Sequence, residues 1–93
     1  IIIMCIFEKL ANNLEVSPIV SGEEIEFIVT ELDLKTLDSV EKLVDKRNEL
    51  VRWFSDKTHH YRIKGDWENF DKYNNASSKS VAVIDNKLYS MRG

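Results

Sequence analysis

The sequence has 93 residues but only one cysteine, one proline and three glycines. A single cysteine, Cys5, excludes an internal disulfide and a cysteine-rich zinc site. The glycines form no phosphate-binding loop, and the chain has neither a Gly-x-Ser-x-Gly sequence nor a paired Cys/His signature. We therefore expect a protein that is not an enzyme and that uses no metal and no other cofactor.

Long apolar runs are also lacking. No run approaches the ~20 residues that a membrane-spanning helix needs, and nothing resembles a signal peptide, so we expect a cytoplasmic protein with no membrane contact. Residues 1–3 precede Met4, and we interpret them as vector-derived residues ahead of the native initiator. With 43% hydrophobic and 31% charged residues, the composition is that of a globular chain, and the length suits a single domain over residues 1–93.

Two segments have the apolar spacing of amphipathic helices. Apolar residues at positions 3, 6, 7, 10, 11 and 14 predict a short N-terminal helix over residues 3–14. A longer stripe from Leu37 to Phe54 predicts the main helix, over residues 37–56, with Thr36 as its N-cap.

The segment 17–34 has two possible structures. Ser21 and Glu24 have the spacing of a capping box and favour a helix. Ile25, Phe27 and Val29 alternate in a stretch rich in strand-forming residues, which favours a strand. We prefer a β-hairpin formed by residues 17–20 and 25–32.

The C-terminal part is predicted to contain further strands. Residues 59–64 are interpreted as a strand closed by Gly65, followed by a helical turn over 66–73 and a polar loop over 74–80. Residues 80–84 and 87–91 flank Asp85-Asn86, which predicts a second hairpin. The fold class is therefore α+β, with the long helix packed on a small antiparallel sheet.

Charge is distributed unevenly along the chain. Residues 1–44 have a net charge of −6, and residues 45–93 have a net charge of +3. The acidic residues are densest in one segment and are Glu23, Glu24, Glu26, Glu31, Asp33 and Asp38. If they form one surface, it would attract a basic surface of another protein.

This charge pattern favours a non-enzymatic protein-binding module. Its partner would be a protein with a basic, nucleic-acid-binding surface that the acidic residues block. Small acidic inhibitors of this kind are encoded by phages and mobile elements, and we expect such an origin here.

A first alternative is a protein that binds single-stranded nucleic acid. Rings beside cations can stack on bases and contact phosphates, and here they are Tyr61, Arg62, Lys64, Trp67 and Tyr73. A pI near 5.3 and interspersed carboxylates oppose this alternative. The adjacent His59 and His60 have no metal-ligand spacing.

A second alternative is a structural homodimer through the long helix, so the chain is a monomer or a homodimer. Leu37, Val40, Val44, Val51 and Phe54 approximate a coiled-coil seam, with Arg47 at one seam position.

Overall fold

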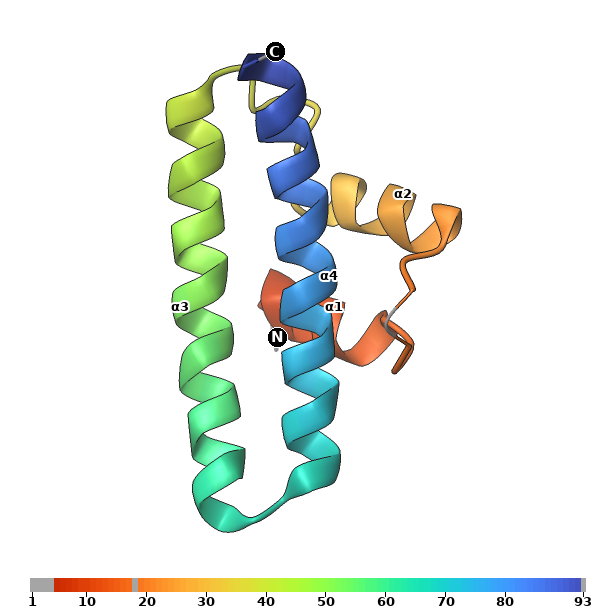
Figure 1. Cartoon of the computed structure of the whole chain (residues 1–93), viewed down its shortest axis with the longest axis vertical. Coiled ribbons are helices and arrows are strands. Elements are labelled where there is room, and N and C mark those ends of the chain that lie inside the picture. The colour runs from red at the N-terminus through yellow and green to blue at the C-terminus, as the bar shows by residue number, and fades with distance from the viewer. Residues whose placement is uncertain (1–4, 18, 93) are drawn as a thin grey trace, which may run out of the picture.

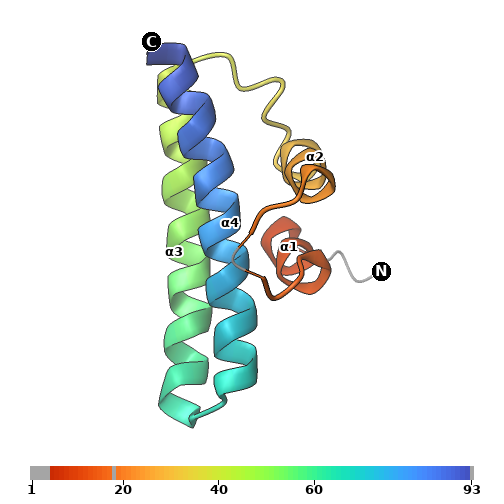
Figure 2. The same cartoon turned by 45° about the vertical axis from the view of Figure 1, so that its right-hand side comes forward.

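Two long helices form an antiparallel hairpin, and two short helices lie together on one side of it (Figures 1 and 2). The structure is a computed structural model that describes residues 5–17 and 19–92. The four helices are α1 (Ile6–Asn13), α2 (Gly22–Glu31), α3 (Val40–Lys64) and α4 (Trp67–Arg92). No strand occurs among the described residues, so the predicted α+β class and its antiparallel sheet are wrong.

The two predicted amphipathic helices are present. The N-terminal one is α1; residues 3 and 4 of the predicted range lie outside the described residues. The main helix is α3, which begins at Val40 rather than 37 because Ser39, not Thr36, caps it. The Ser39 side chain accepts a hydrogen bond from the Lys42 backbone N–H at 3.2 Å.

The predicted hairpin of residues 17–20 and 25–32 is wrong, because residues 22–31 form α2. The capping alternative was the correct one: Ser21 Oγ accepts the Glu24 backbone N–H at 3.1 Å. Residues 22–31 form a helix although Ile25, Phe27 and Val29 favour strands. The helix buries Ile28 completely in the core, and this burial outweighs the strand preference of its neighbours. Residue 18 of the first predicted strand lies outside the described residues.

The predicted strand at 59–64 is wrong, since α3 continues to Lys64. It ends at Gly65, whose φ of 72° lies in the left-handed region that favours glycine. The Gly65 N–H donates to the Arg62 carbonyl and the Asp66 N–H donates to the Tyr61 carbonyl, which is the Schellman pattern of a helix C-terminus. Asp66 then accepts the Asn69 backbone N–H at 3.3 Å and caps α4.

The loop predicted over 74–80 and the hairpin predicted over 80–91 are also wrong, because α4 runs through both. Seven residues of α4 are buried at helical spacing: Tyr73, Ala76, Lys79, Ser80, Val83, Ile84 and Leu88. Two of them are small, so the apolar stripe is hard to see in the sequence. Packing outweighs the weak helix propensity of the asparagines and serines in this segment.

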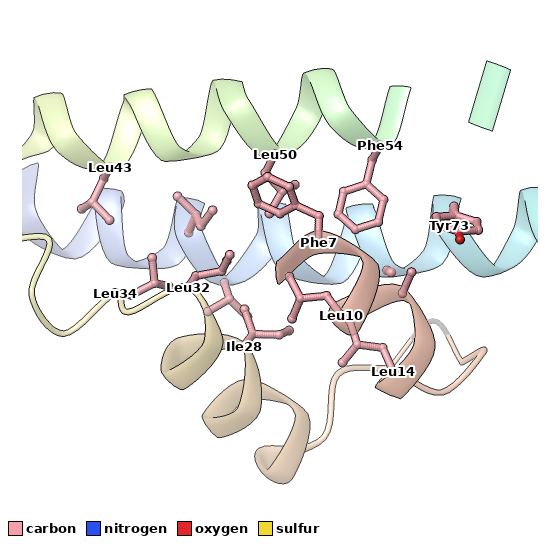
Figure 3. Close-up of a cluster of buried hydrophobic side chains, with 14 of the residues drawn as sticks. Phe7, Leu10, Leu14, Ile28, Leu32, Leu34, Leu43, Leu50, Phe54 and Tyr73 are labelled. Atoms are coloured by element: carbon pink, nitrogen blue, oxygen red, sulfur yellow. The ribbon is translucent and has the colours of Figure 1, made fainter. Parts of the chain in front are cut away.

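The hydrophobic core lies between the hairpin and the two short helices (Figure 3). Phe7 of α1 contacts the rings of Trp53 and Phe54 of α3, with centroid distances of 5.7 and 6.2 Å. Leu10 and Ile28, from α1 and α2, are fully buried. The short helices thus cover one face of the hairpin, and no helix formed by residues 5–17 or 19–92 covers the opposite face (Figure 2).

Candidate functional site

Lysines neutralise most of the predicted acidic segment. Four of its six carboxylates lie within 4 Å of a lysine, in the pairs Glu24–Lys79, Glu26–Lys35, Glu31–Lys9 and Asp38–Lys42. Glu23 and Asp33 are exposed, and neither forms an ion pair with a described residue. The six side chains therefore do not form one open negative surface.

The pair of Glu24 and Lys79 is buried and has a structural role. Lys79 Nζ lies 2.6 Å from Glu24 Oε2, and the Lys79 side chain is only 2% exposed. The same ammonium donates to the Glu15 carbonyl at 2.8 Å. This lysine therefore links α4 both to α2 and to the segment that leads into α2.

Asp38 is the most exposed member of the paired set. The hydrogen bond from the Lys42 ammonium, at 3.1 Å, holds the pKa of this carboxyl below its usual value. Asp38 therefore stays ionised to a lower pH than a free aspartate, but its charge is paired with Lys42 of α3.

The predicted nucleic-acid-binding residues separate into two groups. Tyr73 is 4% exposed, and its hydroxyl donates to Glu8 Oε1 at 2.7 Å. Tyr61 is half-buried and stacks on Tyr73 at a centroid distance of 5.3 Å. Neither ring is free to stack on a base. The remaining three, Arg62, Lys64 and Trp67, are exposed at the tip of the hairpin.

Burial and the carboxylate of Glu8 both act on Tyr73. Loss of solvent around the phenol, followed in size by its hydrogen bond to Glu8, raises the pKa of Tyr73 above its ordinary value of 10. The hydroxyl therefore remains a neutral donor at all physiological pH values. Its role is to join α4 to α1.

A groove of about 540 Å³ lies where the beginning of α1 meets the outer side of α3. Two aromatic rings, Phe7 and Trp53, line it together with Cys5. The other lining residues are polar and come from successive turns of α3, namely Asp45, Asn48, Glu49, Arg52 and Asp56. Its volume exceeds those of two other surface pockets, of about 380 and 280 Å³, that lie elsewhere on the described part of the chain.

The carboxylates of this groove are less neutralised than those of the acidic segment. Glu49 has Lys46 at 3.7 Å, whereas Asp45 and Asp56 form no ion pair with a described residue. Arg52 is the one cation among the lining residues. Three carboxylates and one guanidinium give this groove a net negative charge beside an aromatic surface.

The groove was not identified from the sequence, although a signal was present. Asp45, Glu49, Arg52 and Asp56 recur at intervals of four, three and four, which places them on one face of the predicted helix. A charged stripe of this kind is usually a solvated helix face, and no binding role was predicted for it. The spacing of these residues does not indicate where α1 lies. Phe7 of α1 packs against Trp53 and lines the groove.

Other chemistries receive no support from the described residues. His59 and His60 are both exposed on α3, and no group of three potential metal ligands occurs in ranges 5–17 and 19–92. Within the same ranges, no helix is sufficiently long and apolar to span a membrane.

Comparison with protein-family models, with curated proteins and with solved structures finds no match to this chain. Its function is therefore inferred from its own surface.

Proposed function

We propose that this chain is a non-enzymatic protein-binding module that takes up a basic segment of another protein in the groove between α1 and α3. One observation carries the proposal: the rim carboxylates Asp45 and Asp56 have no cationic partner among the described residues, and they lie beside the aromatic side chains of Phe7 and Trp53. Acidic groups next to rings are complementary to lysine and arginine, which combine a charged end with an apolar stem.

The groove offers two kinds of contact to such a side chain. The methylene groups of an incoming lysine or arginine would pack on Trp53, and its charge would lie near Asp45 or Asp56. Trp53 already accepts a cation, since Lys57 Nζ lies 5.2 Å from its ring centroid. Phe7, which is largely buried in the core, packs against Trp53 and lines the same groove.

Binding would inhibit a partner whose basic segment contacts nucleic acid. An occupied segment cannot reach phosphates, so the effect is steric and needs no catalytic group. The net charge of −3 adds long-range attraction toward such a partner. In this proposal the acidic segment 23–38 contributes to the field of the whole molecule, and the groove provides the contact.

The test uses a fluorescein-labelled peptide of alternating arginine and leucine as the probe. Replacing Asp45 and Asp56 by asparagine should weaken binding about tenfold or more, because both charges of the contact are removed. The matched control replaces Glu23 by glutamine and Asp33 by asparagine, which changes the net charge by the same two units. It should weaken binding less than about threefold, since only long-range attraction is reduced.

The comparison of the two variants decides between surfaces. Equal losses of peptide affinity in the two variants would mean that only the net charge of the protein matters. A larger loss of affinity in the control variant would mean that the peptide contacts the acidic segment instead of the groove. In a Trp67→Phe background, Trp53 is the sole tryptophan, and its emission should change when the peptide binds.

A second candidate function is binding of single-stranded nucleic acid at the hairpin tip. It is favoured by Trp67, which is 58% exposed and follows the exposed cations Arg62 and Lys64 at the end of α3. In a Trp53→Phe background, quenching of Trp67 by oligothymidine at low salt tests it. An unchanged spectrum at about 0.1 mM protein would exclude it, because non-specific binders are usually detected by then.

A further inference from the structure

The charges that line the groove follow a fixed order along α3. Four exposed residues form the row, namely Asp45, Glu49, Arg52 and Asp56. At 100° per residue they lie within about 60° of one another around the helix axis, so they share one face of the helix. From the beginning of α3 to its end, the row carries two negative charges, one positive charge and one further negative charge. A segment bound in the groove meets these charges in that order.

Arg52 forms no ion pair with a described residue, although carboxylates lie one turn away on both sides. Glu49, three residues earlier, is 3.7 Å from Lys46 instead. Asp56 follows Arg52 by four residues, and a cation on the N-terminal side of its partner is the less favourable order for an ion pair within a helix. The exposed guanidinium of Arg52 is therefore available to a carboxylate of another molecule.

The row also has the spacing of an extended peptide. At 1.5 Å per residue, Arg52 lies about 6 Å from Asp56 along the helix axis. Alternate residues of an extended chain are about 6.6 Å apart and point to the same side. A peptide side chain opposite Asp56 therefore places the side chain two positions away opposite Arg52. The next one on that side, about 13 Å from the first, lies between Glu49 and Asp45, which are about 10.5 and 16.5 Å from Asp56.

We propose that the groove selects an extended segment in which one acidic residue lies between two basic residues, each two positions away, and that Arg52 determines this selectivity. The inference rests on the proposed function, in which the groove is the peptide-binding site. One peptide cation would pair with Asp56, and the other with the carboxylates of Asp45 and Glu49. The central carboxylate would accept hydrogen bonds from the guanidinium of Arg52.

Arg52 also acts against segments in which every charge is positive. Such a segment would place a third cation beside the Arg52 guanidinium, and this like-charge contact lowers its affinity for the groove. Net charge predicts the opposite preference: the chain carries −3, so long-range attraction favours the peptide with more positive charge. A preference for a peptide with a central carboxylate therefore cannot arise from net charge.

The test compares two fluorescein-labelled peptides, Arg-Leu-Glu-Leu-Arg and Arg-Leu-Gln-Leu-Arg, which differ only in the central charge. Each sequence reads the same in both directions, so either orientation in the groove presents the same charge order. Fluorescence anisotropy at low salt should show that the parent chain binds the glutamate peptide about threefold or more tightly than the glutamine peptide. Arg52→Gln should abolish this preference, because the partner of the central carboxylate is removed.

Arg62→Gln is the matched control. Arg62 is exposed in the last turn of α3, outside the groove, and its replacement changes the net charge by the same one unit. This variant should keep the preference of the parent chain for the glutamate peptide.

The outcomes separate this inference from the proposed function. If the parent chain and Arg52→Gln discriminate equally between the peptides, or if the parent chain prefers the glutamine peptide, Arg52 does not determine selectivity, and the groove remains a binding site. If neither peptide binds, or if binding is unchanged when Asp45 and Asp56 are replaced by asparagine, the proposed function fails and this inference fails with it.

Discussion

The Lys79 ammonium and the Glu24 carboxylate form a buried ion pair, 2.6 Å apart, at the point where α4 meets α2. The pair is enclosed, with side-chain exposures of 2% and 10%. A buried charge is stabilised by its partner and is costly without it. The contact therefore determines where α2 lies on the hairpin, and it leaves Glu24 unavailable to any other protein.

Removing only one member of this pair should be strongly destabilising. Glu24→Gln leaves the Lys79 ammonium buried without a counter-charge, and we expect a loss of roughly 3–5 kcal/mol in the free energy of unfolding. The double variant Glu24→Leu/Lys79→Met should recover most of that loss. Urea denaturation measures both. As a control, Asp38→Asn breaks the fully exposed pair with Lys42 and should have a much smaller effect.

Alkaline pH should weaken the fold through Tyr73. Its pKa is raised in the folded state, mainly by burial and then by Glu8, so the neutral phenol is favoured by folding. The stabilisation of the fold by the neutral phenol is therefore complete below the ordinary pKa of 10 and is lost as the pH rises above that value. Urea denaturation from pH 8 to 11 should show the loss.

Two tyrosine variants separate this effect from general alkaline unfolding. Tyr73→Phe should lose the hydrogen bond to Glu8 at neutral pH, about 1 kcal/mol, and should show a shallower decline above pH 10. Tyr89→Phe, at a site that is 82% exposed, should retain the steep decline of the parent chain. Identical slopes for both variants would show that Tyr73 does not cause the alkaline loss.

The sequence predicts the helices whose apolar stripes are long and regular, and fails where packing hides the stripe. Leu43, Leu50 and Phe54 recur at helical spacing, and α3 is found there. In α4 the buried positions include Ala76, Lys79 and Ser80, whose small or charged side chains do not mark an apolar stripe in the sequence. Only the contacts of α4 with the other helices show that these positions are internal.

The pairing of the surface charges is equally hard to predict from the sequence. Glu24 and Glu31 belong to an acidic run in the sequence, yet their lysine partners, Lys79 and Lys9, are 55 and 22 residues away. No local pattern reports such pairs. The groove likewise combines an α3 stripe that the sequence contains with α1, whose position follows only from the tertiary fold.

Gly65→Ala should destabilise the hairpin by roughly 1–2 kcal/mol, because a Cβ is unfavourable at its φ of 72°. Gly22→Ala provides the control: Gly22 begins α2, and an added Cβ meets no atom within 4 Å at either glycine. The difference between the two variants in thermal denaturation therefore isolates the left-handed backbone. Equal stabilities would mean that the turn between α3 and α4 relaxes to accept alanine.

Ser80→Ala should stabilise the protein. The Ser80 hydroxyl is fully buried and has no hydrogen-bond partner in the described part of the chain, so its removal relieves a desolvation cost of about 1–3 kcal/mol. Alanine adds a favourable helix propensity of roughly 0.5 kcal/mol. Ser78→Ala, at an exposed position of the same helix, supplies the propensity gain alone. Urea denaturation should rank the chains Ser80→Ala, then Ser78→Ala, then the parent. A Ser80→Ala protein no more stable than Ser78→Ala would show that the hydroxyl is satisfied in solution, for example by the carbonyl one turn earlier in α4.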